Sequence, residues 1–188
     1  MSSTTTLAIA VRPDATSLAR FTGAVHLAGV FMIVAAVVRL AGLLGFAGVS
    51  FHAVLWSVAM ALVSSLATAA CGVFALAVAR FLRYVPERGA PLPGLLLNLP
   101  MVRSIAAGTL ALQLAVEALS PILNAGMIMG VRMSIPGGSM RNVWYAIVQP
   151  LTTIPGTLVA LLVILGVGYA MQFAIQWRTW SVKEDSTP

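Results

Sequence analysis

The chain has 188 residues, of which 60% are hydrophobic and only 9% are charged. Soluble domains carry about 25% charged residues, so the five acidic side chains here do not suit the surface of a soluble protein. Together with a mean hydropathy of +0.98, this composition excludes a soluble enzyme, a secreted disulfide scaffold and a disordered tail. The net charge of +6 comes from basic residues beside apolar runs, which favours contact with anionic lipid over nucleic acid.

Four apolar segments divide the chain, at residues 21–44, 54–79, 104–130 and 155–177. Each exceeds the ~20 helical residues that cross about 30 Å of hydrocarbon. Helices are required because open strands leave backbone groups unpaired in lipid. We therefore expect one all-α membrane domain over residues 1–188, a four-helix transmembrane bundle. Thr152 or Thr153 is expected to cap the fourth helix, with Pro155 in its first turn.

The basic residues predict the orientation of the bundle. The first apolar run is too long for a cleavable signal, so we expect it to be retained as a span. Four spans place both termini and the 82–102 linker on one side, and the 131–153 loop, with a short interfacial helix at 140–148, on the other. The first side carries Arg12, Arg20, Arg80, Arg83, Arg88, Arg103, Arg178 and Lys183, and the second carries Arg39, Arg132 and Arg141. This excess predicts cytoplasmic N and C termini.

A polar stripe marks the third span. Its members are separated by three or four residues and share one helical face: Thr109, Gln113, Glu117, Ser120 and Asn124. Glu117 lies near the middle of the span, where a charge costs at least ~2.5 kcal/mol, so it is expected to face protein or water. Pro121 follows four residues later, lacks the N–H that would bond the Glu117 carbonyl, and predicts a kink.

Depth along the helices gives Glu117 one candidate partner. Glu117 lies about 21 Å from Arg103, and Arg39 lies about 28 Å from Arg20, which places Arg39 and Glu117 within reach of a long side chain. We therefore predict an Arg39–Glu117 ion pair, with Asn124 as a further acceptor. In the alternative, Arg39 extends to the outer interface and Glu117 is protonated and hydrogen-bonded to its neighbours.

The stripe suits binding of a cation, a proton, or a lipid or quinone with a polar head, and the alternative is that it only joins helices. No metal or other cofactor is predicted. His26 and His52 lie at opposite ends of a helical hairpin, about 25 Å apart, too far to share one metal ion. Asp14 and Asp185 lie in the tails, so the bundle offers no Ser/His/Asp triad. An enzyme is therefore the least favoured class.

Small residues recur at helical spacing on two spans and predict close helix packing, either within the bundle or with a partner subunit or second copy. On the second span they are Ala53, Ser57, Ala61, Ser64, Thr68, Gly72, Ala75 and Ala79, and on the fourth they are Gly166, Ala170 and Ala174.

Two families share local features with this chain. The segment from Met101 to Gly108, which enters a span from a basic linker, resembles small bacterial four-span proteins of unknown function, and this resemblance implies a bacterial inner membrane. Arg39 near the end of span one and Trp56 at the start of span two are similar to the small membrane subunit of tripartite solute transporters. Ser57 and Val58 stand where that family has acidic residues.

Two functions follow as hypotheses. The first is a subunit or accessory protein of a larger inner-membrane complex, docked through small-residue faces. The second is a small transporter or channel component that uses Glu117.

Overall fold

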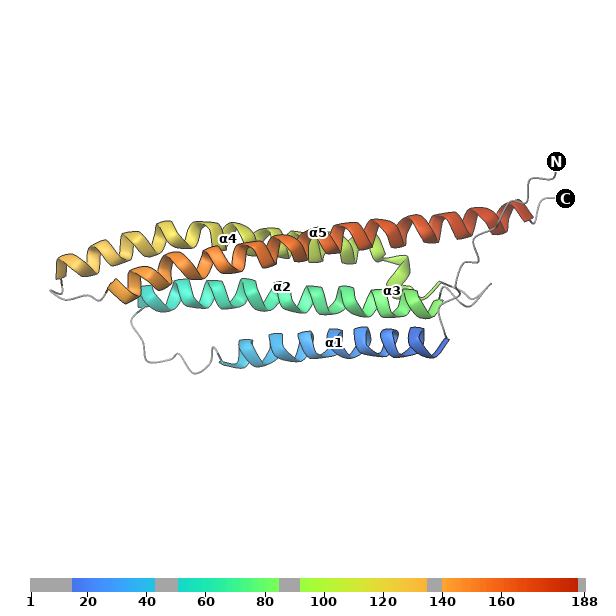
Figure 1. Ribbon diagram of the computed structural model, residues 1–188, viewed down its shortest axis with the longest axis horizontal. Coiled ribbons are helices and arrows are strands. Elements are labelled where there is room, and N and C mark those ends of the chain that lie inside the picture. The colour runs from blue at the N-terminus through green and yellow to red at the C-terminus, as the bar shows by residue number, and fades with distance from the viewer. Residues whose placement is uncertain (1–14, 43–50, 85–91, 135–139, 186–188) are drawn as a thin grey trace, which may run out of the picture.

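The computed structural model describes residues 15–42, 51–84, 92–134 and 140–185, with side chains for 16–42, 58–84, 92–119 and 152–177. These residues form α1 (Ala15–Gly42), α2 (Phe51–Tyr84), the short α3 (Gly94–Leu97), α4 (Leu99–Ser134) and α5 (Met140–Asp185) (Figure 1). Four of these helices, α1, α2, α4 and α5, are long and apolar enough to cross a membrane. The predicted all-α, four-helix bundle is confirmed.

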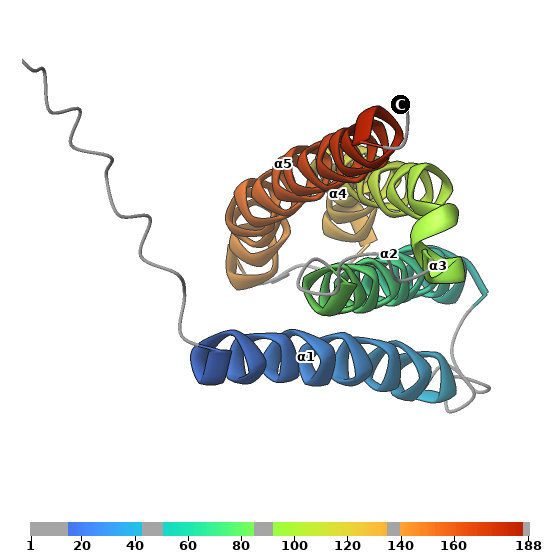
Figure 2. The same cartoon turned by 90° about the vertical axis from the view of Figure 1, so that its right-hand side faces the viewer.

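The helices form layers around α2. Figure 2 shows α1 on one side of α2 and the pair of α4 and α5 on the other. Helix α1 packs principally against α2, whereas α2 also contacts α4 and α5, and α4 packs along α5. Helix α2 is therefore the central helix, and it separates α1 from α4.

Two glycines set the spacing between α1 and α2. A Cβ added at Gly72 would lie 2.8 Å from the carbonyl oxygen of Gly29, and one added at Gly29 would lie 2.9 Å from the carbonyl oxygen of Gly72. Buried residues continue this contact at seven-residue intervals, Thr22 and Ala36 on α1, and Ser65 and Ala79 on α2. Lipid tails give no hydrophobic drive between helices, so this close van der Waals approach is a main contribution to holding α1 against α2.

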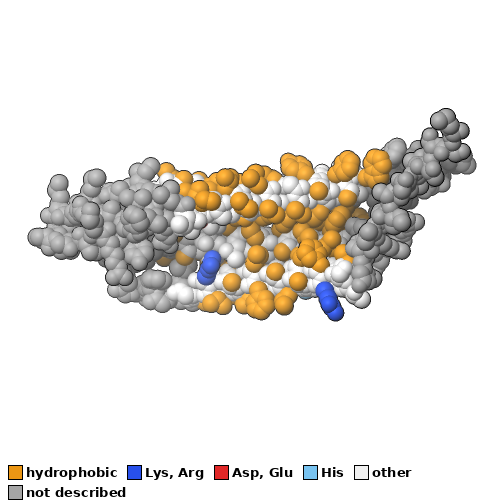
Figure 3. Space-filling model, in the orientation of Figure 1, with side chains coloured by type: hydrophobic (Ala, Val, Ile, Leu, Met, Phe, Trp, Pro, Cys, Tyr) orange, Lys and Arg blue, Asp and Glu red, His pale blue; other side chains and the backbone are white. Residues whose placement is uncertain are grey.

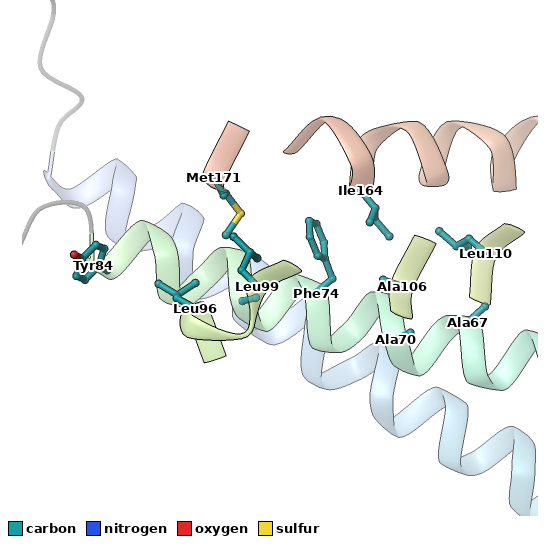
Figure 4. Packing of buried hydrophobic residues seen from close by; sticks show 11 residues of the cluster. Ala67, Ala70, Phe74, Tyr84, Leu96, Leu99, Ala106, Leu110, Ile164 and Met171 are labelled. Carbon is teal, nitrogen blue, oxygen red and sulfur yellow. The ribbon is translucent and has the colours of Figure 1, made fainter. Parts of the chain in front are cut away.

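The opposite face of α2 packs on α4 and α5. It presents Ala67, Ala70, Phe74 and Ala77, which meet Ala106 and Leu110 of α4, and Ile164 and Met171 of α5 (Figure 4). At the C-terminal end of α2, Tyr84 belongs to the same core as Leu96 of α3 and Leu99 at the start of α4. Small side chains on α2 therefore let all three helices meet along one line.

The outward faces of the helices are apolar. Figure 3 shows hydrophobic side chains over the described part of one face, with isolated basic groups and no acidic ones. Large exposed side chains on α1 include Phe21, Leu27, Phe31, Val34 and Val38. Such a surface suits hydrocarbon as its solvent.

The helices run further than the apolar segments predicted. Helix α2 ends at Tyr84, and α4 begins at Leu99 with Pro100 in its first turn, where a missing N–H does no harm. The 82–102 linker is thus shorter than expected and contains α3. An apolar run marks only the part of a helix that lies in hydrocarbon, whereas the helix and its backbone hydrogen bonds continue into the membrane interface.

The predicted start of the fourth helix is wrong. Helix α5 runs unbroken from Met140 through Pro150 and Pro155, so Thr152 and Thr153 lie inside it and do not cap it. The 140–148 segment is helical but continuous with the span, and within the predicted 131–153 loop residues 131–134 belong to α4 and residues 140–153 to α5. Proline is tolerated inside membrane helices because neighbouring groups bond the freed carbonyls. The 46 residues of α5 correspond to a length of about 69 Å, well beyond the thickness of one hydrocarbon core.

Candidate functional site

A buried carboxylate lies between α4 and α5. Glu117, about halfway along α4, is 7% exposed, and Thr157 of α5 is 8% exposed. Thr157 Oγ1 lies 2.9 Å from Glu117 Oε2, and Gln113 Nε2 donates to Glu117 Oε1 at 2.8 Å. Both oxygens of the carboxyl group therefore have a polar partner inside the protein.

Helical spacing explains how these groups meet. Gln113 and Glu117 are four residues apart on α4, so their side chains lie one above the other on the same face. The antiparallel packing of α5 brings Thr157 to this face from the other side. Thr157 Oγ1 also lies 3.2 Å from the carbonyl oxygen of Thr153, one turn earlier on α5. A continuous row of oxygens thus joins the carboxyl group to the backbone of α5.

The Thr157 hydroxyl has one proton and two acceptors. When Glu117 is ionised, the hydroxyl donates to Oε2. When Glu117 is protonated, its O–H can donate to Thr157 Oγ1, and Thr157 can then donate to the Thr153 carbonyl. Gln113 donates to Oε1 in both states. The site therefore satisfies both protonation states without moving a heavy atom, by rotation of one hydroxyl.

The predicted ion pair between Arg39 and Glu117 is not the arrangement found. Arg39 Nη1 instead lies 3.5 Å from Ser64 Oγ and 3.4 Å from Thr68 Oγ1, both on α2. The reason is the layering, because α1 packs on α2 and α2 stands between α1 and α4. Glu117 is instead hydrogen-bonded to two neutral side chains, Gln113 and Thr157.

The remaining members of the predicted stripe divide into two groups. Thr109 bonds the carbonyl oxygen of Ala106 in its own helix, at 3.0 Å, and takes no part in the site. The side chains of Ser120, Pro121 and Asn124 lie outside the described side chains, although α4 continues as a helix through them. The kink at Pro121 and a role for Asn124 stay predictions.

Thr157 was missed by the sequence reasoning, although a signal for it existed. It is a hydroxyl residue in the otherwise apolar first part of the fourth span, residues 155–168. What the sequence does not supply is the register between α4 and α5, which decides whether Thr157 faces Glu117 or lipid.

A second polar cluster, also missed, lies nearer the start of α4. Arg103 crosses to α5, where its Nη1 donates to Gln172 Oε1 at 2.7 Å and its Cζ lies 3.8 Å from the centre of the Tyr169 ring. Its stem occupies space left by Gly168, since a Cβ there would lie 2.6 Å from Arg103 Cδ. The sequence signal was a glycine next to a tyrosine, with a glutamine three residues further on.

The described residues hold no group of three His, Cys, Asp or Glu side chains able to bind a metal ion. His26 is exposed on α1, and His52 lies outside the described side chains. The absence of a metal site stays a prediction for the whole chain.

Comparisons with protein-family models, with curated proteins and with solved structures each find no match. The chemistry of the sites therefore carries the functional argument, and the two family resemblances stay predictions.

Proposed function

We propose that this protein is an integral membrane subunit in which Glu117 binds and releases a proton at mid-membrane, as part of a proton-coupled transport system. The observation that carries the proposal is the placement of Thr157 Oγ1 between Glu117 Oε2 and the Thr153 carbonyl oxygen. A carboxyl group that changes protonation state inside a membrane needs partners that suit both states, and this row of oxygens supplies them.

A proton suits this site better than a metal cation. Hard cations need six or more oxygen ligands, whereas one partner of Glu117 is the amide N–H₂ of Gln113, which donates to Oε1. That donor competes with a cation for the same oxygen. Among the described hydrogen bonds of the site, Thr157 Oγ1 and the Thr153 carbonyl are the neutral oxygens in the row, fewer than a hard cation takes.

Helix adhesion alone does not account for a carboxyl group here. Interhelical hydrogen bonds in membranes contribute about 0.6 kcal/mol on average, and a glutamine would make equivalent bonds to Gln113 and Thr157. An ionisable group at this depth adds a cost of at least ~2.5 kcal/mol whenever it is charged. Its presence is explained by a function that uses the charge change.

The test is proton movement into proteoliposomes that hold the protein, purified together with its co-purifying chains, and a trapped pH-sensitive dye. Glu117→Gln keeps the shape and hydrogen bonds and removes the titration, so we expect proton flux to fall at least about tenfold. Thr157→Val is isosteric, removes the hydroxyl, and should reduce flux severalfold.

Thr22→Val is the matched control, because Thr22 is also buried but bonds only the Leu18 carbonyl in its own helix, at 2.8 Å. Its flux should equal that of the wild type. Equal flux in wild type and Glu117→Gln, or wild-type flux no higher than in protein-free vesicles, would contradict the proposal.

Docking on a larger complex is a second candidate function, supported by the small-residue face of α5. Gly166, Ala170 and Ala174 are exposed, and nothing lies within 4 Å of a Cβ added at Gly166. The corresponding region of α2, around Gly72, already receives α1. Gly166→Ile should therefore leave the fold intact and release co-purifying chains, whereas Gly108→Ile, also in open space on α4, should release none.

A further inference from the structure

Arg39, in the last turn of α1, is exposed and makes two long contacts with α2. Its Nη1 lies 3.5 Å from Ser64 Oγ and 3.4 Å from Thr68 Oγ1. The Thr68 hydroxyl donates to the Ser64 carbonyl oxygen at 2.7 Å, so Thr68 Oγ1 acts as an acceptor toward Arg39. A guanidinium has five N–H donors, and these contacts involve one of its nitrogens. The described contacts therefore leave donors for a further acceptor.

The guanidinium of Arg39 points toward the middle of the hydrocarbon. Gly29 faces Gly72 in the antiparallel pair of α1 and α2 (Figure 1), so Arg39, ten residues after Gly29, is level with the position ten residues before Gly72. The two hydroxyls that Arg39 contacts lie two and six residues closer to Gly72, about 3 and 9 Å further from the Gly42 end of α1. The midpoint of the 54–79 apolar run falls between these two hydroxyl residues. Arg39 thus reaches mid-membrane and does not extend to the interface beyond its own helix end.

The charge of Arg39 has no acidic partner within the described part of the chain. The sequence has no Asp or Glu from residue 15 to residue 86, so α1 and α2 carry none. Glu117 lies beyond α2 and is bonded to Gln113 and Thr157. The other acidic residues form or adjoin in the sequence the start of α1, the end of α2 and the end of α5: Asp14, Glu87, Glu184 and Asp185. Figure 1 shows these three helix ends together, at the opposite end of the bundle from the end of α1.

A carboxylate on a neighbouring membrane helix suits this position better than a lipid phosphate. Arginine keeps its charge in proteins, and a charge within the hydrocarbon is costly unless it has partners. Large exposed side chains at this level are apolar: Val37 and Val38 on α1, and Leu62 and Leu66 on α2. Headgroup phosphates lie beyond the hydrocarbon, about 15 Å from its middle, and an arginine that binds them extends toward the interface. Arg39 extends the other way, to a depth where a membrane-spanning helix can place a carboxylate.

We propose that the surface formed by Arg39, Ser64 and Thr68 binds a transmembrane helix of a different protein, one that carries an aspartate or glutamate at mid-membrane. The guanidinium would pair with that carboxylate through two parallel N–H···O bonds. A second copy of this chain in the same membrane orientation brings no such group, because its Glu117 is buried and its other acidic residues belong to the far end of the bundle. This surface is separate from the proton site at Glu117 and from the exposed face of α5.

The test uses the full-length protein, freed of co-purifying chains, in phosphatidylcholine vesicles with synthetic transmembrane peptides of leucine and alanine, about 24 residues long. One peptide has a single aspartate at its middle, one has it a turn from an end, and one has none. Energy transfer between a dye on the protein and a dye on the peptide measures association. Wild type should bind the central-aspartate peptide at least about tenfold more tightly than either of the others.

Variants of the protein locate the contact. Arg39→Met keeps a straight stem and removes an exposed charge, so it should melt as wild type does and lose the preference for the central aspartate. Arg20→Met is the matched control, because Arg20 is an exposed arginine near the start of the same helix, and it should keep the preference. Arg39→Glu reverses the charge and should prefer a peptide with a central lysine.

Several results would overturn the proposal, and the first needs no variant. Wild type that binds the three peptides equally has no surface for a mid-membrane carboxylate. A preference that survives in Arg39→Met, or that is lost equally in Arg20→Met, places the contact elsewhere or reduces it to general charge attraction. Loss of the wild-type preference when phosphatidylglycerol is added to the vesicles would assign Arg39 to lipid phosphate. Proton flux does not enter these measurements, so they stand apart from the test of Glu117.

Discussion

Glu117 is buried with two neutral donors, and a neutral side chain of the same shape fits its place. Glu117→Gln can accept from Gln113 and donate to Thr157 Oγ1, which then donates to the Thr153 carbonyl. We expect its free energy of unfolding in detergent to match wild type within about 0.5 kcal/mol. Glu117→Leu removes the hydrogen bonds to Gln113 and Thr157, and should lower the free energy of unfolding by about 1 kcal/mol.

Denaturation in a graded mixture of mild and denaturing detergent measures both variants. If Glu117→Gln lost as much stability as Glu117→Leu, the negative charge itself would be a structural requirement. That result would contradict a site able to accept both protonation states.

At this scale the sequence predicted which residue is unusual, but not its partners. The four-residue spacing placed Gln113 beside Glu117, because both lie on one helix. Thr157 and the Arg39 contacts depend on how different helices sit against one another. Counting residues along each helix gives the depth of a side chain in the membrane. It does not show which helix stands between two others. Here α2 separates Arg39 from Glu117.

Among the helices, the contact between α1 and α2 is the one most sensitive to a single methyl group. Gly72→Ala would bring a Cβ within 2.8 Å of both the Gly29 carbonyl oxygen and Ile33 Cγ1. Backbone cannot move aside as a side chain does, so α1 and α2 must separate. We expect a loss of 1–3 kcal/mol, roughly the usual cost of overpacking, seen as a lower melting temperature in detergent.

Gly23→Ala is the matched control on α1, where a Cβ meets nothing within 4 Å. It should leave the melting temperature unchanged. A Gly72→Ala protein as stable as Gly23→Ala would show that α1 is not held by this close approach.

Helix number was predictable from the sequence, whereas helix ends were not. Apolar length reports the hydrocarbon crossing, so all four spans were found. Capping signals at Thr152 and Thr153, with Pro155 after them, suggested a helix start, but α5 passes through all three. Proline destabilises the interior of a helix in soluble proteins. In a packed membrane helix, neighbouring groups bond the carbonyls that proline leaves free and offset this cost.

For the molecule as a whole, the charge distribution predicts which end faces the cytoplasm. Gly94 on α3 and Gly42 at the end of α1 lie at opposite ends of the bundle, and a Cβ at either meets nothing within 4 Å. In a Cys71→Ser background, which removes the single cysteine, each can be replaced by cysteine. A membrane-impermeant maleimide on intact cells should label Gly42→Cys, and should label Gly94→Cys only after permeabilisation.

Labelling of Gly94→Cys in intact cells would show that the protein has the opposite orientation. The excess of basic residues would then fail as a guide for this chain, and the Arg103 cluster would face the outer leaflet.

Infrared spectroscopy of the reconstituted protein observes directly whether Glu117 changes its protonation state inside the bundle. Acidification should produce a carboxylic-acid C=O band in wild type that is missing in Glu117→Gln. In Thr157→Val the band should shift, because the O–H of Glu117 loses its acceptor. The band should disappear again when the pH is raised. Identical pH-difference spectra for wild type and Glu117→Gln would contradict a change of protonation at Glu117.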